Sequence, residues 1–151
     1  MRAFAIVRLV VAAAIIAGAV ALARIGGLHG DPHQVLKAVF DHASGLPRQA
    51  MVALIIAAPL AILLTLARFI RRKRHAPAQS LSLFNALAPL VGMVAAAADM
   101  IGVAGVVPAG HWPRLGAIAP ALAEAALVLG LGLLVGAIAA LPKGASWNGG
   151  T

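Results

Sequence analysis

The chain has 151 residues, of which 62% are hydrophobic and only 11% are charged, and its mean hydropathy is +1.00. An ordinary soluble domain is about half apolar and a quarter charged, so this composition excludes a soluble protein and predicts an all-α integral membrane protein. The formal net charge of +8 comes from basic residues gathered at the ends of apolar runs. That placement is typical of membrane topology signals and argues against a nucleic-acid partner. Because the chain has no cysteine, disulfides, thiolate catalysis and cysteine metal sites are excluded.

The first apolar block covers about residues 3–23 and contains one charged residue, Arg8. The long side chain of Arg8 can extend to the nearby membrane interface. The block also resembles a secretory signal, because Arg2 and Arg8 precede an apolar centre and Ala21-Leu22-Ala23 resembles a cleavage site. We favour a retained first transmembrane helix, since the apolar run is long for a signal, and cleavage is the alternative.

A polar connection follows, and within it the sequence predicts a short amphipathic helix over about residues 32–43. Asp31 followed by Pro32 is a favourable helix start. Ser44-Gly45 ends the pattern. Between these limits apolar residues recur at helical spacing, namely Val35, Leu36, Val39 and Phe40. Such a helix lies on the membrane surface or on the helix bundle.

Three more apolar blocks predict transmembrane helices over about residues 50–70, 81–107 and 116–141, which gives four spans in all. A basic cluster follows the second span directly, formed by Arg71, Arg72, Lys73 and Arg74. The positive-inside rule places this cluster in the cytoplasm, so both termini are expected to be cytoplasmic. The connections are short, and residues 1–151 therefore form a single membrane domain embedded in lipid.

Asp99 and Glu124 are the only acidic residues within the predicted spans. They occupy matching depths on antiparallel helices joined by a short loop. An ionised carboxylate in the middle of a membrane helix costs about 2.5 to 3.5 kcal/mol on insertion scales, so such groups face protein or water. One interpretation is an ion or proton path, or a contact for a partner helix. The other is a structural pair satisfied by a shared proton, by Arg24 or Arg114, or by a backbone group.

Small residues recur in the last two spans at a spacing of four, as Gly92 with Ala96 and Gly132 with Gly136. Faces of this kind allow helices to approach closely in lipid, so we expect these spans to pack on each other or on copies of the chain. Pro89, three residues before Gly92, is included among these packing positions. Pro59, Pro89 and Pro120 also free backbone carbonyls that a pore can use, but such prolines are more often tolerated kinks.

The sequence gives little support for a metal site or for catalysis. His29, Asp31, His33, Asp41 and His42 fall close together, but they form no complete ligand set, and we interpret them as a solvated connection with a helix cap. The chain has no nucleophile beside a plausible base and no glycine-rich phosphate loop after a strand. We therefore expect no metal, no cofactor, no catalytic residue and no enzymatic activity.

The last two spans resemble the MotA/TolQ/ExbB proton-channel family. In that family one span reads roughly P-x-x-G-M, and the matching residues are Pro89, Gly92 and Met93. The next span reads roughly A-x-A-L-x-T-T-x-x-G and closes with Leu-Pro, and the ExbB-like version begins I-A-E-A. The corresponding residues are Leu122, Ala123, Glu124, Ala125, Gly132, Leu141 and Pro142. Four spans with both termini inside resemble the MotA branch, and the resemblance covers about 60 of the 151 residues.

The resemblance implies a homo-oligomeric ring, a pentamer in the family, around single-span partner helices of the MotB/ExbD type. Proton flow through such a ring drives mechanical work at the cell envelope, from the cytoplasmic (inner) membrane of a bacterium. The chain departs from the family at its pore hydroxyls, which fall on Ala96, Val128 and Leu129, and Asp99 stands where the family has glycine. The large cytoplasmic region between the second and third spans is also missing.

Two functions from different classes are therefore open. One is a channel-like subunit in which Asp99 and Glu124 contact protons or a partner helix. The other is a non-conducting membrane assembly or scaffold protein that packs through its small-residue helix faces. A small-solute transporter is less favoured, because no second inverted repeat is detectable.

Overall fold

The computed structural model describes residues 2–43, 45–70, 78–106 and 113–141, and every regular element in these ranges is a helix. The helices are α1 (Arg2–Ile25), α2 (Pro32–His42), α3 (Gly45–Ile70), α4 (Ala78–Val106) and α5 (Leu115–Ala140). The expected all-α class is confirmed for this part of the chain. Helix α3 begins at Gly45, five residues earlier than the span predicted from hydropathy, because a polar turn precedes its apolar segment.

Four of these helices, α1, α3, α4 and α5, are long and apolar enough to cross a membrane. This finding confirms the prediction of four candidate spans and gives the chain the fold of a multi-pass membrane protein. The short helix α2 lies between the first two of them in the chain. The basic cluster Arg71, Arg72, Lys73 and Arg74 lies outside the described residues.

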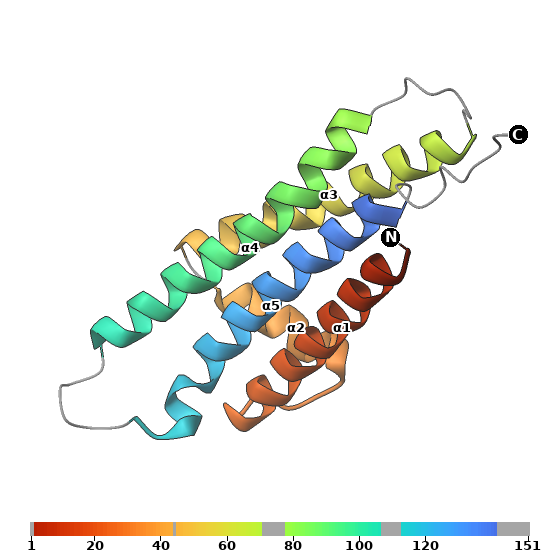
Figure 1. Ribbon diagram of the computed structural model, residues 1–151. Helices are drawn as coiled ribbons and strands as arrows, with labels where there is room; N and C mark the ends of the chain where they lie inside the picture. Colours follow the sequence, from red (N-terminus) through yellow and green to blue (C-terminus); the bar gives the residue numbers. More distant parts are fainter. Residues whose placement is uncertain (1, 44, 71–77, 107–112, 142–151) are drawn as a thin grey trace, which may run out of the picture.

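The four long helices run alternately up and down along one direction, as Figure 1 shows. We call the end at which α1 begins and α5 finishes the terminal end, and the opposite end the distal end. Helix α5 contacts each of the other four described helices, most extensively α4 and α1. Half of the most hydrophobic 18-residue stretch of α5 is buried inside the protein, whereas only 17% of the corresponding stretch is buried in α1 and in α4. The bundle is therefore built around α5.

An alanine stripe joins α1 to the rest of the bundle. Ala5, Ala12 and Ala19 follow one another at intervals of seven residues, and each is at most 1% exposed. Seven residues make two helical turns, so these positions lie on one face of α1. Gly130 of α5 packs against that helix so closely that a Cβ atom there would lie 2.6 Å from Cγ1 of Ile16. Small side chains on both helices thus permit the close contact between α1 and α5.

Helix α2 crosses the bundle behind α5 instead of running along it (Figure 1). Pro32 occupies its first turn, where the missing backbone N–H costs nothing. Val35 and Val39 are buried, and the helix contacts both α1 and α5. Gly45 has a φ of +61°, a conformation that glycine adopts without strain, and it allows the chain to turn directly from α2 into α3.

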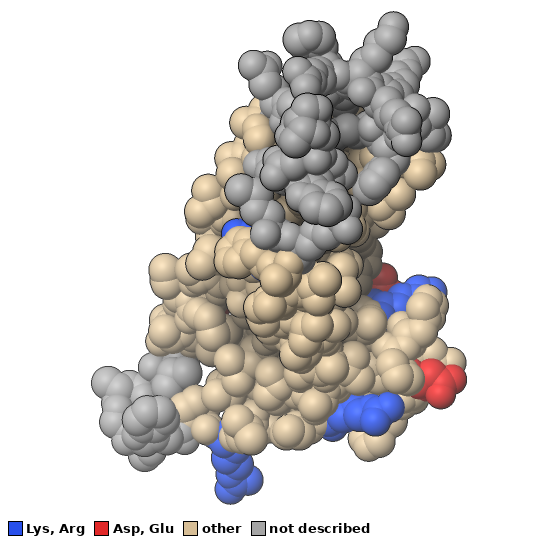
Figure 2. All heavy atoms as spheres, turned by 45° about the vertical axis from the view of Figure 1, so that its right-hand side comes forward, with Lys and Arg blue, Asp and Glu red and all other residues tan. Residues whose placement is uncertain are grey.

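The outer surface of the bundle is apolar over most of its length. Ile56 of α3 and Val94 and Ile101 of α4 are 65%, 63% and 73% exposed. In Figure 2 most of the visible charged side chains gather toward the distal end, while uncharged surface covers the middle of the molecule. A surface of this kind is unfavourable in water and suited to the hydrocarbon of a bilayer.

Candidate functional site

Helices α4 and α5 approach each other very closely at two glycines. A Cβ atom on Gly132 would lie 2.5 Å from the carbonyl oxygen of Ala88, and one on Gly92 would lie 2.9 Å from the carbonyl oxygen of Val128. The two backbones touch directly at this point, because neither glycine carries a side chain to hold them apart. The small residues predicted to be packing sites thus face each other within a single chain.

Three further residues from the same prediction lie at or near this contact. The ring of Pro89 packs against Gly136, where a Cβ atom would come within 2.8 Å of the proline Cγ. Ala96, one turn beyond Gly92, is partly buried against the core of the bundle. Pro89 lies inside α4, and the helix continues through it. The contact therefore extends along α4 and α5 from the terminal end toward the middle of the bundle.

The register of this contact places Asp99 and Glu124 at nearly the same level. Asp99 lies seven residues beyond Gly92, and Glu124 lies eight residues before Gly132 on the antiparallel helix. Because Gly92 and Gly132 touch, the two carboxyl groups lie within about one turn of each other along the bundle axis. Seven residues also return Asp99 to the α5-facing side of α4. Both side chains are partly buried in the distal half of the bundle.

Asp99 has an unusual environment. Its Oδ2 atom is buried and has no hydrogen-bond partner among the described residues. Burying such an oxygen without a partner costs about 1 to 3 kcal/mol, and more when the group is charged. Buried polar groups of this kind are uncommon in proteins, and those that persist often have a functional role.

Glu124 interacts electrostatically with two neighbours: Asp99, which repels its negative charge, and His42 of α2, which attracts it when protonated. The Nδ1 atom of His42 lies 2.6 Å from the carbonyl oxygen of Ala38. A carbonyl oxygen can only accept, so Nδ1 donates the proton in this hydrogen bond. The three groups do not form a metal site, since no set of three potential ligands is gathered for a metal ion anywhere in the described ranges.

The two arginines that could have neutralised the carboxyl pair lie elsewhere. Arg24 donates from Nη2 to the carbonyl oxygen of Gly30, at 3.2 Å, in the turn after α1. Arg114 precedes the first residue of α5. Ten residues of helix then separate it from Glu124, a rise of about 15 Å that exceeds the length of its side chain. The structural explanations that remain for the pair are a proton shared between the two carboxyl groups and a backbone group.

A second polar contact lies in the terminal half of the bundle and was missed from the sequence. Arg8 Nη1 donates to Asn85 Oδ1 at 2.7 Å, which joins α1 to α4 although 77 residues separate the two positions. The guanidinium Cζ also lies 4.6 Å from the centre of the Phe4 ring, a favourable cation–π distance. The sequence did contain a signal: Arg8 and Asn85 are polar residues at similar distances from the terminal end of their helices.

We expect the Arg8–Asn85 hydrogen bond to show a measurable coupling energy. Hydrogen bonds between helices in a membrane contribute about 0.6 kcal/mol on average, and the charge on Arg8 favours a value of about 1 to 2 kcal/mol. The measurement is a double-mutant cycle with Arg8→Gln and Asn85→Ala, using unfolding of the detergent-solubilised protein. Strictly additive effects of the two substitutions would contradict the contact.

Comparisons with known proteins add no assignment: no family model matches the chain, and neither curated proteins nor solved structures give a match.

Proposed function

We propose that this protein is a channel-like membrane subunit that moves protons by way of Asp99 and Glu124. The observation that carries the proposal is the buried Oδ2 atom of Asp99, which has no hydrogen-bond partner among the described residues. An ionisable group inside a membrane helix is costly, and it is retained where ions or protons must pass. Glu124 lies at the same level on α5 and provides a second carboxyl group, so a proton can move between the two carboxyl groups.

The proposed orientation follows from the sequence. The basic cluster after α3, Arg71 to Arg74, belongs on the cytoplasmic side by the positive-inside rule. The terminal end of the bundle is then cytoplasmic, and the carboxyl pair lies in the outer half of a bacterial inner membrane.

The assembly we propose is a homo-oligomeric ring, with a single-span membrane protein of the MotB/ExbD type inside it. Its support is the resemblance of α4 and α5 to the MotA/TolQ/ExbB family. The exposed apolar side chains of α4, among them Leu90, Met93 and Val94, offer a surface that such contacts would cover.

The alternative, a non-conducting scaffold that assembles through its small-residue faces, has less support. Gly92, Gly132 and Gly136 are used in the contact between α4 and α5 of one chain, so they are not free to bind another. A scaffold would also gain nothing from a buried carboxyl group that lacks a partner.

The test is proton flux into vesicles. The protein is purified in mild detergent together with any small membrane protein that accompanies it, and is reconstituted into liposomes that enclose a pH-sensitive dye. A potassium gradient with valinomycin then drives protons inward. We expect Asp99→Asn and Glu124→Gln each to lower the flux at least about ten-fold, because neither amide can carry a proton through its side chain.

A matched control is Asp31→Asn, which neutralises an exposed acid outside the spans and should leave the flux unchanged. Native mass spectrometry of the same sample gives the number of subunits and reveals any partner. The proposal is overturned if the wild-type flux equals that of empty liposomes, or if neither carboxyl substitution changes it.

A further inference from the structure

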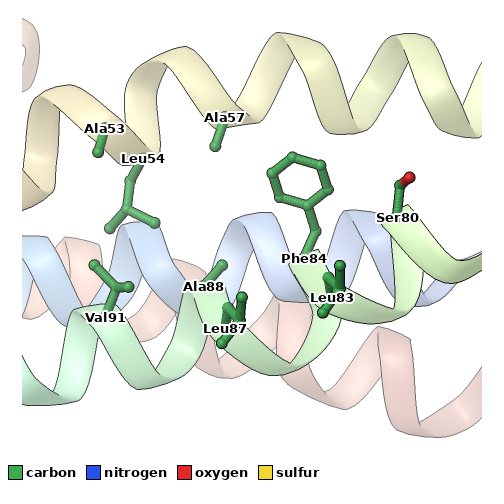
Figure 3. Close-up of a pocket in the computed structure, with 9 residues that line it drawn as sticks. All are labelled: Ala53, Leu54, Ala57, Ser80, Leu83, Phe84, Leu87, Ala88 and Val91. Atoms are coloured by element: carbon green, nitrogen blue, oxygen red, sulfur yellow. The ribbon is translucent and has the colours of Figure 1, made fainter.

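A groove runs between α3 and α4 in the terminal half of the bundle, and Figure 3 shows its lining. Its volume is about 340 Å³. Three of its lining residues come from α3 and six from α4: Ala53, Leu54, Ala57, Ser80, Leu83, Phe84, Leu87, Ala88 and Val91. Ser80 is the only polar residue among them, and it lies near the start of α4, at the terminal end of the groove.

The length of the groove matches one leaflet of a bilayer. From Ser80 to Val91 the helix rises about 16 Å. The hydrocarbon core of a bilayer is about 30 Å thick, so one leaflet contributes about 15 Å. The groove therefore begins near the level of the headgroups and ends near the middle of the membrane.

The lining of the groove distinguishes between possible occupants. Eight of its nine residues are apolar, and exposed apolar side chains such as Leu83 and Leu87 place it on the surface that faces the hydrocarbon of the bilayer. Water is unfavourable there, because the lining offers it almost no hydrogen-bonding groups.

We propose that this groove binds one acyl chain of a phospholipid from the leaflet at the terminal end of the bundle. The chain lies between α3 and α4, in contact with Leu83, Leu87 and the ring of Phe84, and its ester end is level with Ser80 (Figure 3). It fills space beside the direct contact between α3 and α4, so it adds to the packing of these two helices. This binding site is independent of proton movement at Asp99 and Glu124.

The test uses a phosphatidylglycerol and a phosphatidylethanolamine that each carry a photoreactive group midway along one acyl chain. The full-length protein is reconstituted with a small fraction of either lipid, irradiated and digested, and the labelled peptides are identified by mass spectrometry. We expect the groove-lining residues within 53–57 and 83–91 to be labelled several-fold more strongly than the other lipid-facing residues of α3 and α4. Comparable labelling by both lipids is expected, since the acyl chain is the group bound.

Two substitutions give a matched comparison. Ala53 is an exposed residue in the lining, so Ala53→Phe should fill the groove and lower the labelling at least about five-fold. Ala86 is also exposed and lies on α4 at a similar depth, but it is not part of the lining, so Ala86→Phe should leave the labelling unchanged. Circular dichroism of both variants reports whether the helices are retained.

Two outcomes would overturn the binding site itself, and a third would overturn recognition through the acyl chain. One is label spread evenly over the lipid-facing residues of the wild-type protein. This result is obtained without any variant, so it does not depend on whether a variant folds. The other is equal labelling of folded Ala53→Phe and wild-type protein. A label confined to one of the two lipids would contradict recognition through the acyl chain.

Discussion

Replacing Gly132 by valine is expected to lower the stability of the bundle by about 3 kcal/mol or more. Even the first added atom, the Cβ, would lie 2.5 Å from the carbonyl oxygen of Ala88 and 3.2 Å from the Cα atom of Gly92. Both neighbours belong to the backbone of a helix, so neither can rotate away, and α4 and α5 must move apart. The separation also loses contact along the most extensive helix pair in the protein. Thermal unfolding in detergent, followed by circular dichroism, measures the effect as a large drop in Tm.

Two other glycines serve as controls for this prediction. Gly102, also on α4, has nothing within 4 Å of the position that a Cβ atom would occupy, so Gly102→Ala should leave Tm unchanged or slightly higher. At Gly130 the nearest atom is Cγ1 of Ile16, a side-chain atom and not backbone, so Gly130→Ala should have an intermediate effect. Equal effects at Gly132 and Gly102 would show that α4 and α5 are not in backbone contact.

Hydropathy was enough to predict the four long helices, because each apolar block is close to the length that a bilayer requires. It could not predict that α5 is central. All four blocks are strongly apolar, and burial by protein and burial by lipid favour the same residues. The one available signal was the high content of alanine and glycine in α5, which allows neighbours to approach it on more than one side. Residue volume was therefore more informative than hydrophobicity about the arrangement inside the membrane.

The candidate site was only partly predictable for a similar reason. Counting residues from the ends of the predicted spans placed Asp99 and Glu124 at matching depths, since helical rise is regular. The direction in which each side chain points depends on helix rotation, which the small-residue contact determines. His42 was considered only as a weak metal ligand, because its approach to Glu124 depends on α2 crossing the bundle. Arg8 was expected to extend toward the interface, and its contact with Asn85 depends on the packing of α1 and α4 around α5.

Replacing Asp99 by leucine is expected to make the protein more stable and to abolish its proton flux. The substitution removes a buried oxygen without a hydrogen-bond partner among the described residues and adds apolar side chain in a membrane-facing helix. Relief of the buried polar group should raise the free energy of unfolding by about 1 to 3 kcal/mol, visible as a higher Tm. Leucine cannot bind a proton, so the flux measured in liposomes should fall to the level of empty vesicles.

The control for this substitution is Ala98→Leu, which adds apolar volume at an exposed neighbouring position of α4 without removing a carboxyl group. It should change neither Tm nor flux by much, so a gain specific to Asp99→Leu can be attributed to the lost carboxyl group. A lower Tm for Asp99→Leu would mean that the carboxyl group stabilises the fold. That result would contradict the finding that its Oδ2 atom has no hydrogen-bond partner among the described residues. A higher Tm with unchanged flux would separate the carboxyl group from transport and favour the scaffold function. A more stable and inactive protein would show that Asp99 is kept at a cost in stability because proton movement requires it.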